Sequence, residues 1–135
     1  MKTTFDTDAI LFKVLKGSPE VVAAISGGIY PGERPDNSLL EDIAINTVTL
    51  TLDSVPQMGT SNVNIHVPDM DVQISGQVQK KANTMRLKAI TGPVLNALSA
   101  AKVDGLSFQV VLQSTLSEPA IHQHYVNLRI EWNIH

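Results

Sequence analysis

The amino-acid sequence predicts an α+β fold, in which an antiparallel sheet of four to five strands has its helices packed on one face. Three observations predict it: two amphipathic helical segments open the chain, alternation of apolar and polar residues marks two pairs of strands, and a long helical pattern separates those pairs. The predicted order is therefore helix, helix, hairpin, long helix, hairpin. Short connections are enough to build such a sheet.

Apolar spacing and capping residues predict the first two helices. Apolar residues recur at close to helical spacing from Phe5 to Lys16, and Asp6 or Thr7 is a suitable N-cap. A glycine ends this helix. Ser18 then suits the N-cap of a second, short helix, with Pro19 at its first position.

Alternating residues predict the first hairpin, between Ile43 and Val67. The apolar phase changes near Asn46, which indicates a β-bulge in the first strand. A long polar loop, from Ser54 to Asn62, joins the two strands, and Pro68 ends the second one. Because this tip is polar, it is a candidate docking loop for another protein, centred on Pro56, Gln57, Met58 and Gly59.

A polar passage, Asp69 to Gln77, precedes the long helix, and Val72 and Ile74 within it are spaced to extend a β-arm. The helical pattern then begins at about Val78. Gly92 and Pro93 lie inside it and predict a kink, or two abutting helices.

The last strand has the clearest alternation in the chain, with apolar residues on one side from Val126 to Ile134. It pairs with a strand that begins at Leu106, and the turn between them lies at Ser117 to Pro119. Four of the six aromatic residues fall on predicted core faces: Phe5, Phe12, Phe108 and Trp132.

Length and composition bound the class of protein. A chain of 135 residues that is 43% hydrophobic and 17% charged fits a single domain, residues 1–135, with one core. There is no cysteine, which excludes disulfides and thiolate chemistry. The first residues lack a signal-peptide pattern, so we expect synthesis in the cytoplasm. A net charge of -3 is too small to attract nucleic acid or anionic membranes nonspecifically.

The charges are segregated along the chain. The stretch from Pro35 to Gln79 carries acids and no Lys or Arg, whereas the stretch from Lys80 to Lys102 carries bases and no acid. One interpretation is that these are ordinary solvated faces. The other is a pair of complementary surfaces that meet between identical subunits, with the candidate interface residues Asp36, Glu41, Asp42, Lys80, Lys81, Arg86 and Lys88.

No motif predicts catalysis or a cofactor. His122 and His124 are spaced to share one side of a strand, and His66 and His135 are further nitrogen donors, but no metal-binding spacing accompanies them. The sequence also lacks a nucleophile elbow and a phosphate-binding glycine loop. Spare aromatics for stacking bases are scarce, so no sequence-specific nucleic-acid partner is expected.

One short motif carries a family resemblance. A helical lead (Ile10 to Lys16) and an apolar patch (Val21 to Ile25) precede a turn that continues into an extended, proline-containing segment. The turn comprises Gly27, Gly28, Ile29, Tyr30, Pro31 and Gly32. This arrangement resembles the tail-completion family of tailed bacteriophages and prophages, which includes tail terminators and head-tail joining proteins.

The resemblance implies a non-enzymatic structural protein that forms a ring, commonly hexameric, at the head-proximal end of the tail. Such a ring stops growth of the tail tube and offers a surface to the head connector. The implied partners are further copies of the chain, tail-tube proteins and connector proteins, and the implied location is the host cytoplasm during assembly and then the virion tail. The alternative is a small-molecule-binding domain or an unrecognised enzyme on a similar α+β scaffold.

Overall fold

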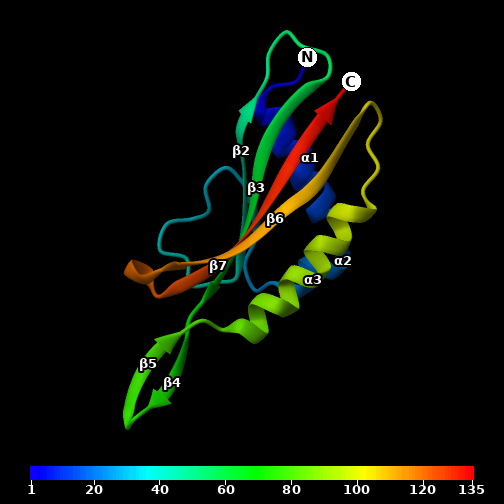
Figure 1. Cartoon of the computed structure of the whole chain (residues 1–135). Helices are drawn as coiled ribbons and strands as arrows, with labels where there is room; N and C mark the ends of the chain where they lie inside the picture. Colours follow the sequence, from blue (N-terminus) through cyan, green and yellow to red (C-terminus); the bar gives the residue numbers. More distant parts are fainter.

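A computed structural model describes the whole chain, residues 1–135, and shows a twisted sheet with helices beside it and a separate hairpin arm (Figure 1). The α+β class and the order helix, helix, hairpin, long helix, hairpin are confirmed. In chain order the elements are α1 (Thr4–Lys16), α2 (Pro19–Ala24), β1 (Ile29–Pro31), β2 (Asp42–Leu50), β3 (Gln57–Pro68), β4 (Met70–Ile74), β5 (Gln77–Lys81), α3 (Thr84–Ala100), β6 (Leu106–Glu118), the 3₁₀ turn η1 (Pro119–Ile121) and β7 (Gln123–Ile134).

The main sheet has five strands in the order β1-β2-β3-β7-β6. All its pairs are antiparallel except β1 with β2, which run parallel, so the sheet is mixed and not wholly antiparallel as predicted. Two neighbouring strands can run parallel only if the connection between them returns the chain to the end of the sheet where the first strand began. The segment between β1 and β2 is long enough to do this. We call this segment, residues 32–41, the strap.

The register of the strands places the apolar side chains on one face. Ile43 of β2 pairs with Ile65 of β3, which pairs with Val126 of β7. These residues join buried side chains of α1 and α3 in one hydrophobic cluster of 18 residues. On the opposite face Asn127 donates to the side-chain oxygens of Asn64, at 2.7 Å, and Asn62, at 3.1 Å. One face is therefore core and the other is polar.

A chain of hydrogen bonds ties α1 to the sheet inside this core. The Nε1 of Trp132 donates to the Oγ of Ser61 at 2.7 Å, and this hydroxyl lies 2.7 Å from the Oγ1 of Thr47. Thr47 in turn donates to Asp8 of α1 at 2.7 Å. Burial raises the pKa of Asp8, although the Thr47 hydroxyl opposes that shift. The polar groups beneath α1 are thus satisfied by one another.

The N-terminus of α1 differs from the prediction. Thr3, and not Asp6 or Thr7, is the N-cap, and the Asp6 side chain accepts from the backbone and hydroxyl of Thr3 to complete a capping box. These hydrogen bonds lower the pKa of Asp6. Because the helix begins earlier, Phe5 lies in its first turn and is 81% exposed, so its predicted place in the core is wrong.

We expect Thr3→Ala to lower the free energy of unfolding by about 1 kcal/mol, since it removes the capping hydroxyl. Thr3→Ser keeps that oxygen and should change little. Urea unfolding of both variants measures the difference. Equal losses in the two variants would show that the cap contributes nothing.

The long helix begins later than predicted. Residues from Val78 to Lys81 belong to β5, which pairs with β4, and α3 starts at Thr84. A turn at Ser75 and Gly76, both with positive φ, closes this hairpin and overrides the local helical pattern. The predicted β-arm is confirmed. α3 is one continuous helix with Pro93 inside it, and not two abutting helices.

The bulge predicted near Asn46 lies at Val48, where the register between β2 and β3 shifts. Val48 is exposed as a result. No helix of the structure has the length and hydropathy that crossing a membrane requires.

Candidate interaction surfaces

The turn from Gly27 to Gly32 is held by close contacts with β2. Gly27 donates its N–H to the carbonyl of Glu41 at 2.9 Å, and a Cβ on Gly27 would lie 1.9 Å from the Asp42 carboxylate. Gly32 has φ +97°, a conformation that favours glycine, and donates to Ile45 at 2.7 Å. The motif residues therefore build β1 and fix the start of the strap.

A buried polar cluster fastens the strap to the polar face of the sheet. Asp42 is 1% exposed and accepts hydrogen bonds from Gly28 N–H at 3.0 Å, Arg34 at 3.2 Å and Ser38 at 2.5 Å. Arg34 also donates to Gln123 of β7, and Gln123 donates to the Ser38 carbonyl at 2.7 Å. The sheet and the strap thus share one charge-assisted network.

The candidate interface residues divide into internal and exposed ones. Arg86 of α3 forms a two-point ion pair with Glu41, at 2.7 and 2.9 Å, within the same chain. Lys80 lies 2.6 Å from Asp71 across the arm. Asp42 is buried beneath the strap. Three members of the set have no ion pair in the chain and are exposed: Asp36, Lys81 and Lys88.

The candidate docking loop is shorter than predicted. Gln57, Met58 and Gly59 lie in β3, and the side chain of Gln57 is buried, where it bonds to the backbone of Lys2 and Thr51. The strand extends further because β3 pairs with β7 from Gln57 onward. Of the four residues, Pro56 alone lies in the connection between β2 and β3.

The histidines lie apart from one another. The prediction that His122 and His124 share one side of a strand is wrong. His122 precedes β7 and has a left-handed backbone conformation. His124 lies 2.6 Å from Asp69. His66 stacks on Tyr125, and its Nδ1 lies 3.0 Å from a Glu118 oxygen, though not at a hydrogen-bonding angle. No group of three or more His, Asp or Glu side chains is placed to hold a metal ion.

His66 gives the fold a predicted dependence on pH. Burial, helped by the nearby Arg34 guanidinium, lowers the pKa of His66 below 6.5, although Glu118 and Asp42 oppose the shift. The unfolded chain therefore takes up a proton at this residue more readily than the folded chain, so stability should fall as the pH drops below about 6.5.

We expect thermal melting scans between pH 7 and pH 5 to show this loss in the wild type and a smaller loss in His66→Gln. His135→Gln, at the exposed chain end, is the matched control and should keep the wild-type profile. The same pH profile in both variants would mean that His66 does not contribute.

The β4–β5 arm projects away from the rest of the chain (Figure 1). Met70, Val72 and Ile74 share one face of its five-residue strand β4, because alternate residues of a strand point the same way. On the other face Lys80 and Asp71 form their ion pair. Met70 and Ile74 are exposed and Val72 is half-buried. The partners of these three residues in β5 are Lys81, Gln79 and Gln77, so the face has an apolar stripe on β4 and a polar one on β5. A two-stranded hairpin is only marginally stable in water, and no layer of the same chain covers this stripe.

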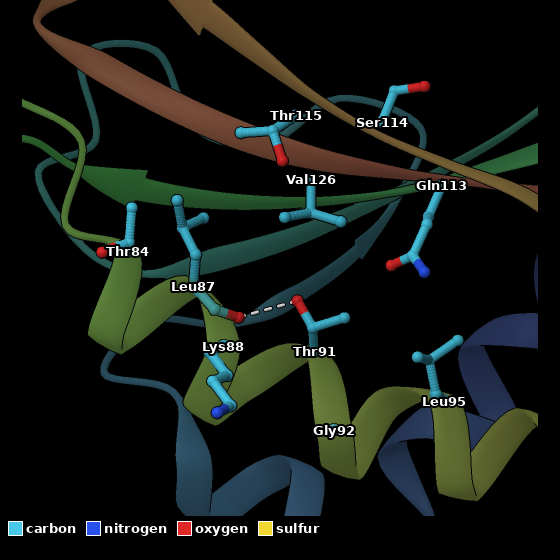
Figure 2. Close-up of a pocket in the computed structure, with 10 residues that line it drawn as sticks. All are labelled: Thr84, Leu87, Lys88, Thr91, Gly92, Leu95, Gln113, Ser114, Thr115 and Val126. Atoms are coloured by element: carbon cyan, nitrogen blue, oxygen red, sulfur yellow. Dashed lines mark hydrogen bonds between the residues drawn. The ribbon is translucent and has the colours of Figure 1, made fainter.

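A groove of about 570 Å³ runs between α3 and β6 (Figure 2). Leu87 and Leu95 of α3 point toward the strands, Gln113 and Thr115 of β6 point back toward α3, and Val126 lies between them. The Thr91 hydroxyl donates to the Leu87 carbonyl at 2.7 Å and so is satisfied within its own helix. Three of the ten residues that line the groove are hydrophobic, namely Leu87, Leu95 and Val126, and most of its exposed surface is apolar.

Strand β6 forms a free edge beside this groove. It is 13 residues long and pairs with β7 alone, so its outer N–H and C=O groups have no strand partner. Proteins usually protect such an edge with charges or proline. Between Leu106 and Ser117 this strand has neither, and its only irregularity is a bulge at Val111.

Two residues of the polar cluster were not singled out from the sequence, namely Arg34 and Gln123. Arg34 carries a usable signal, because it is the single basic residue between Lys16 and Lys80 and lies among acids. Gln123 carries none, since its partners in the strap are far away in sequence. The groove likewise depends on α3 and β6 meeting in space.

Comparison with known proteins shows similarity in structure only. No protein-family model and no curated protein matches the sequence. Among solved structures, the fold matches a chain described as "Virion of native gene transfer agent (GTA) particle" with a TM-score of 0.63 and 12% sequence identity. The match covers 94% of this chain and 92% of that chain. The two chains therefore share a fold over nearly their whole lengths.

Proposed function

We propose that this chain is a non-enzymatic structural protein of a phage or phage-like particle, and that it forms a ring at the head-tail junction. In this role the ring terminates the tail tube and docks the head connector. The observation that carries the proposal is the similarity in fold to a chain of the gene transfer agent virion over nearly the whole of both chains. The turn at Gly27 to Gly32 supports it independently through its resemblance to tail-completion proteins.

The distribution of surfaces also supports a ring. A closed ring needs contacts in which two different surfaces of each subunit meet. This chain has an apolar arm on one part and an open groove with a free strand edge on another. The proposal includes charge pairing between subunits. The residues that would form these pairs are the exposed members of the predicted interface set, Asp36, Lys81 and Lys88.

The ring is tested on the purified protein by light scattering at low and high salt, together with negative-stain microscopy. We expect one defined oligomer with a central hole, more populated at low salt if the exposed charges contribute. A species that stays monomeric at high concentration and low salt would contradict the ring.

The role in the particle is tested by deleting the gene from its phage or prophage. We expect tails of abnormal length, or heads and tails that fail to join, and rescue by the wild-type gene. Normal particles from the deletion strain would exclude the role even if the protein forms a ring. A monomer that binds a small molecule in the α3–β6 groove would instead favour the binding-domain alternative.

A further inference from the structure

We infer that strand β4 of one copy adds to the free β6 edge of the next copy, and that Met70, Val72 and Ile74 cover the groove between α3 and β6. This inference rests on the proposed ring and identifies its subunit contact. The occupant of the groove is thus a segment of a second copy of the same chain. Addition of a strand to a free sheet edge is a common mode of protein recognition.

The arm requires a partner that its own subunit does not provide. Its two strands pair only with each other, in a sheet separate from the main one. Met70 and Ile74 are 44% and 37% exposed, so the apolar side chains of β4 remain in contact with water in the single chain. Burying them against another surface would stabilise the hairpin by the hydrophobic effect.

The strand that docks is β4 and not β5. β5 ends in Lys80 and Lys81, and lysines along a strand edge oppose pairing with a further strand. β4 has three apolar residues on one face, and its one charge, Asp71, lies on the other face. An added β4 would therefore present apolar side chains to α3 and its polar side chains to the opposite face.

The edge and the groove fit a strand of this length. A five-residue strand spans about 17 Å at roughly 3.4 Å per residue. The part of α3 that lines the groove, from Thr84 to Leu95, spans about 18 Å at roughly 1.5 Å per residue. Because α3 runs beneath the edge, a strand placed beside β6 would lie over Leu95 and Thr91 with its inward side chains (Figure 2).

The geometry favours a second copy over the chain's own groove. Only Ala82 and Asn83 separate β5 from α3, and the arm leaves the body at this end and points away from it (Figure 1). Pairing of two β6 edges with each other would cover the edge but leave both arms exposed. Arm and groove are different surfaces, so their contact is head-to-tail and propagates into a ring when the rotation closes.

Disulfide trapping tests the contact, and the chain has no cysteine of its own to interfere. Residues directly opposite each other on adjacent antiparallel strands have Cα atoms about 4.5–5.5 Å apart, within the range of a disulfide. The test variants combine Val72→Cys with Gln113→Cys or with Thr115→Cys. The matched control combines Val72→Cys with Ser114→Cys, because Ser114 pairs with Asn127 of β7, whose side chain lies on the polar face of the sheet.

On mild oxidation we expect at least one test variant to give a ladder of covalent multimers on a non-reducing gel, and the control to give none. An equimolar mixture of the single variant Val72→Cys with Gln113→Cys or Thr115→Cys, whichever gave the ladder, should give heterodimers and nothing larger, since each subunit then has one cysteine. No ladder from either test variant, or a ladder of equal strength from the control, would overturn the inference. Efficient dimers from Thr115→Cys alone would show β6 pairing with β6 and would also overturn it.

A second measurement separates this contact from the ring itself. We expect Thr115→Trp, which fills the groove, to raise the concentration needed for assembly by about tenfold or more. Ser114→Trp on the opposite face should not. Equal melting temperatures of the dilute variants would show that both fold.

Replacing the arm, Met70 to Lys81, with a short Gly-Ser linker should abolish assembly. If the wild type forms a ring and the armless chain forms it equally well, the inference fails and the proposed ring stands. If the wild type forms no ring and the cysteine ladder still appears, the contact stands and the proposed ring fails.

Discussion

Trp132→Ala is expected to lower the free energy of unfolding by about 3–5 kcal/mol, because it leaves a large cavity in the core. Trp132 is 2% exposed and its ring lies 4.9 Å from that of Phe108, centroid to centroid. The substitution also removes the donor to Ser61, and so breaks the hydrogen-bond chain that leads to α1. Because the free energy of unfolding of a protein is typically about 5–15 kcal/mol, this loss is a large fraction of the total.

Urea or guanidinium unfolding measures the effect, with Trp132→Phe as the matched control. Phenylalanine retains an aromatic ring against Phe108 and gives up the indole donor, so it should cost clearly less than alanine. A loss below about 1 kcal/mol for Trp132→Ala would contradict the described packing.

Asp42→Ala is expected to be the second most damaging substitution, at about 3–5 kcal/mol. Asp42 is buried and accepts from Gly28, Arg34 and Ser38. Removing one partner of a buried ion pair leaves the other charge uncompensated, which costs more than the pair itself contributes. The strap should then detach from the sheet and become a site of limited proteolysis.

Asp36→Ala is the matched control, since Asp36 lies in the same strap but is exposed. We expect it to change stability by less than about 0.5 kcal/mol and to leave the strap resistant to protease. Similar losses in the two variants would show that the cluster beneath the strap is not what holds it.

The inferred contact accounts for a feature that would otherwise be hazardous. A free, uncharged edge of 13 residues invites uncontrolled pairing with other chains. If each edge receives the arm of a neighbour and the ring closes, a five-residue stretch of every β6 is paired, and the new outer edge there is β5 with its two lysines. The same edge would then specify assembly in the ring and promote aggregation in a chain that has lost its arm.

Sequence patterns predicted the elements whose signals are local. Alternation from Val126 to Ile134 predicted β7 and its buried face, and Ser18 with Pro19 predicted the start of α2, as the structure confirms. Errors occurred where a contact distant in sequence prevailed over a local pattern. Pairing of β3 with β7 extended β3 into the predicted loop at Gln57, and pairing of β5 with β4 displaced the predicted start of the long helix.

The charged residues show most clearly what could not be predicted from the sequence. The sequence revealed that acids and bases occupy separate stretches, but it could not show which of them meet. Glu41 and Arg86 are 45 positions apart and form an ion pair within one chain, whereas Lys81 and Lys88 remain exposed. Proximity in sequence carries no information about such pairs.

By itself, therefore, the sequence determined the α+β class, the order of the predicted elements and the apolar face of β7, because these follow from periodicities along the chain. It did not determine the apolar faces of β2 and β6, because a bulge in each strand leaves Val48 and Leu112 exposed. The tertiary structure alone decided that the sheet is mixed, that Asp42 and Arg34 are buried together, and that a groove and a free edge lie side by side. Those features depend on which segments meet in space. The burial of polar groups and the exposure of apolar ones are fixed only when the whole chain has folded.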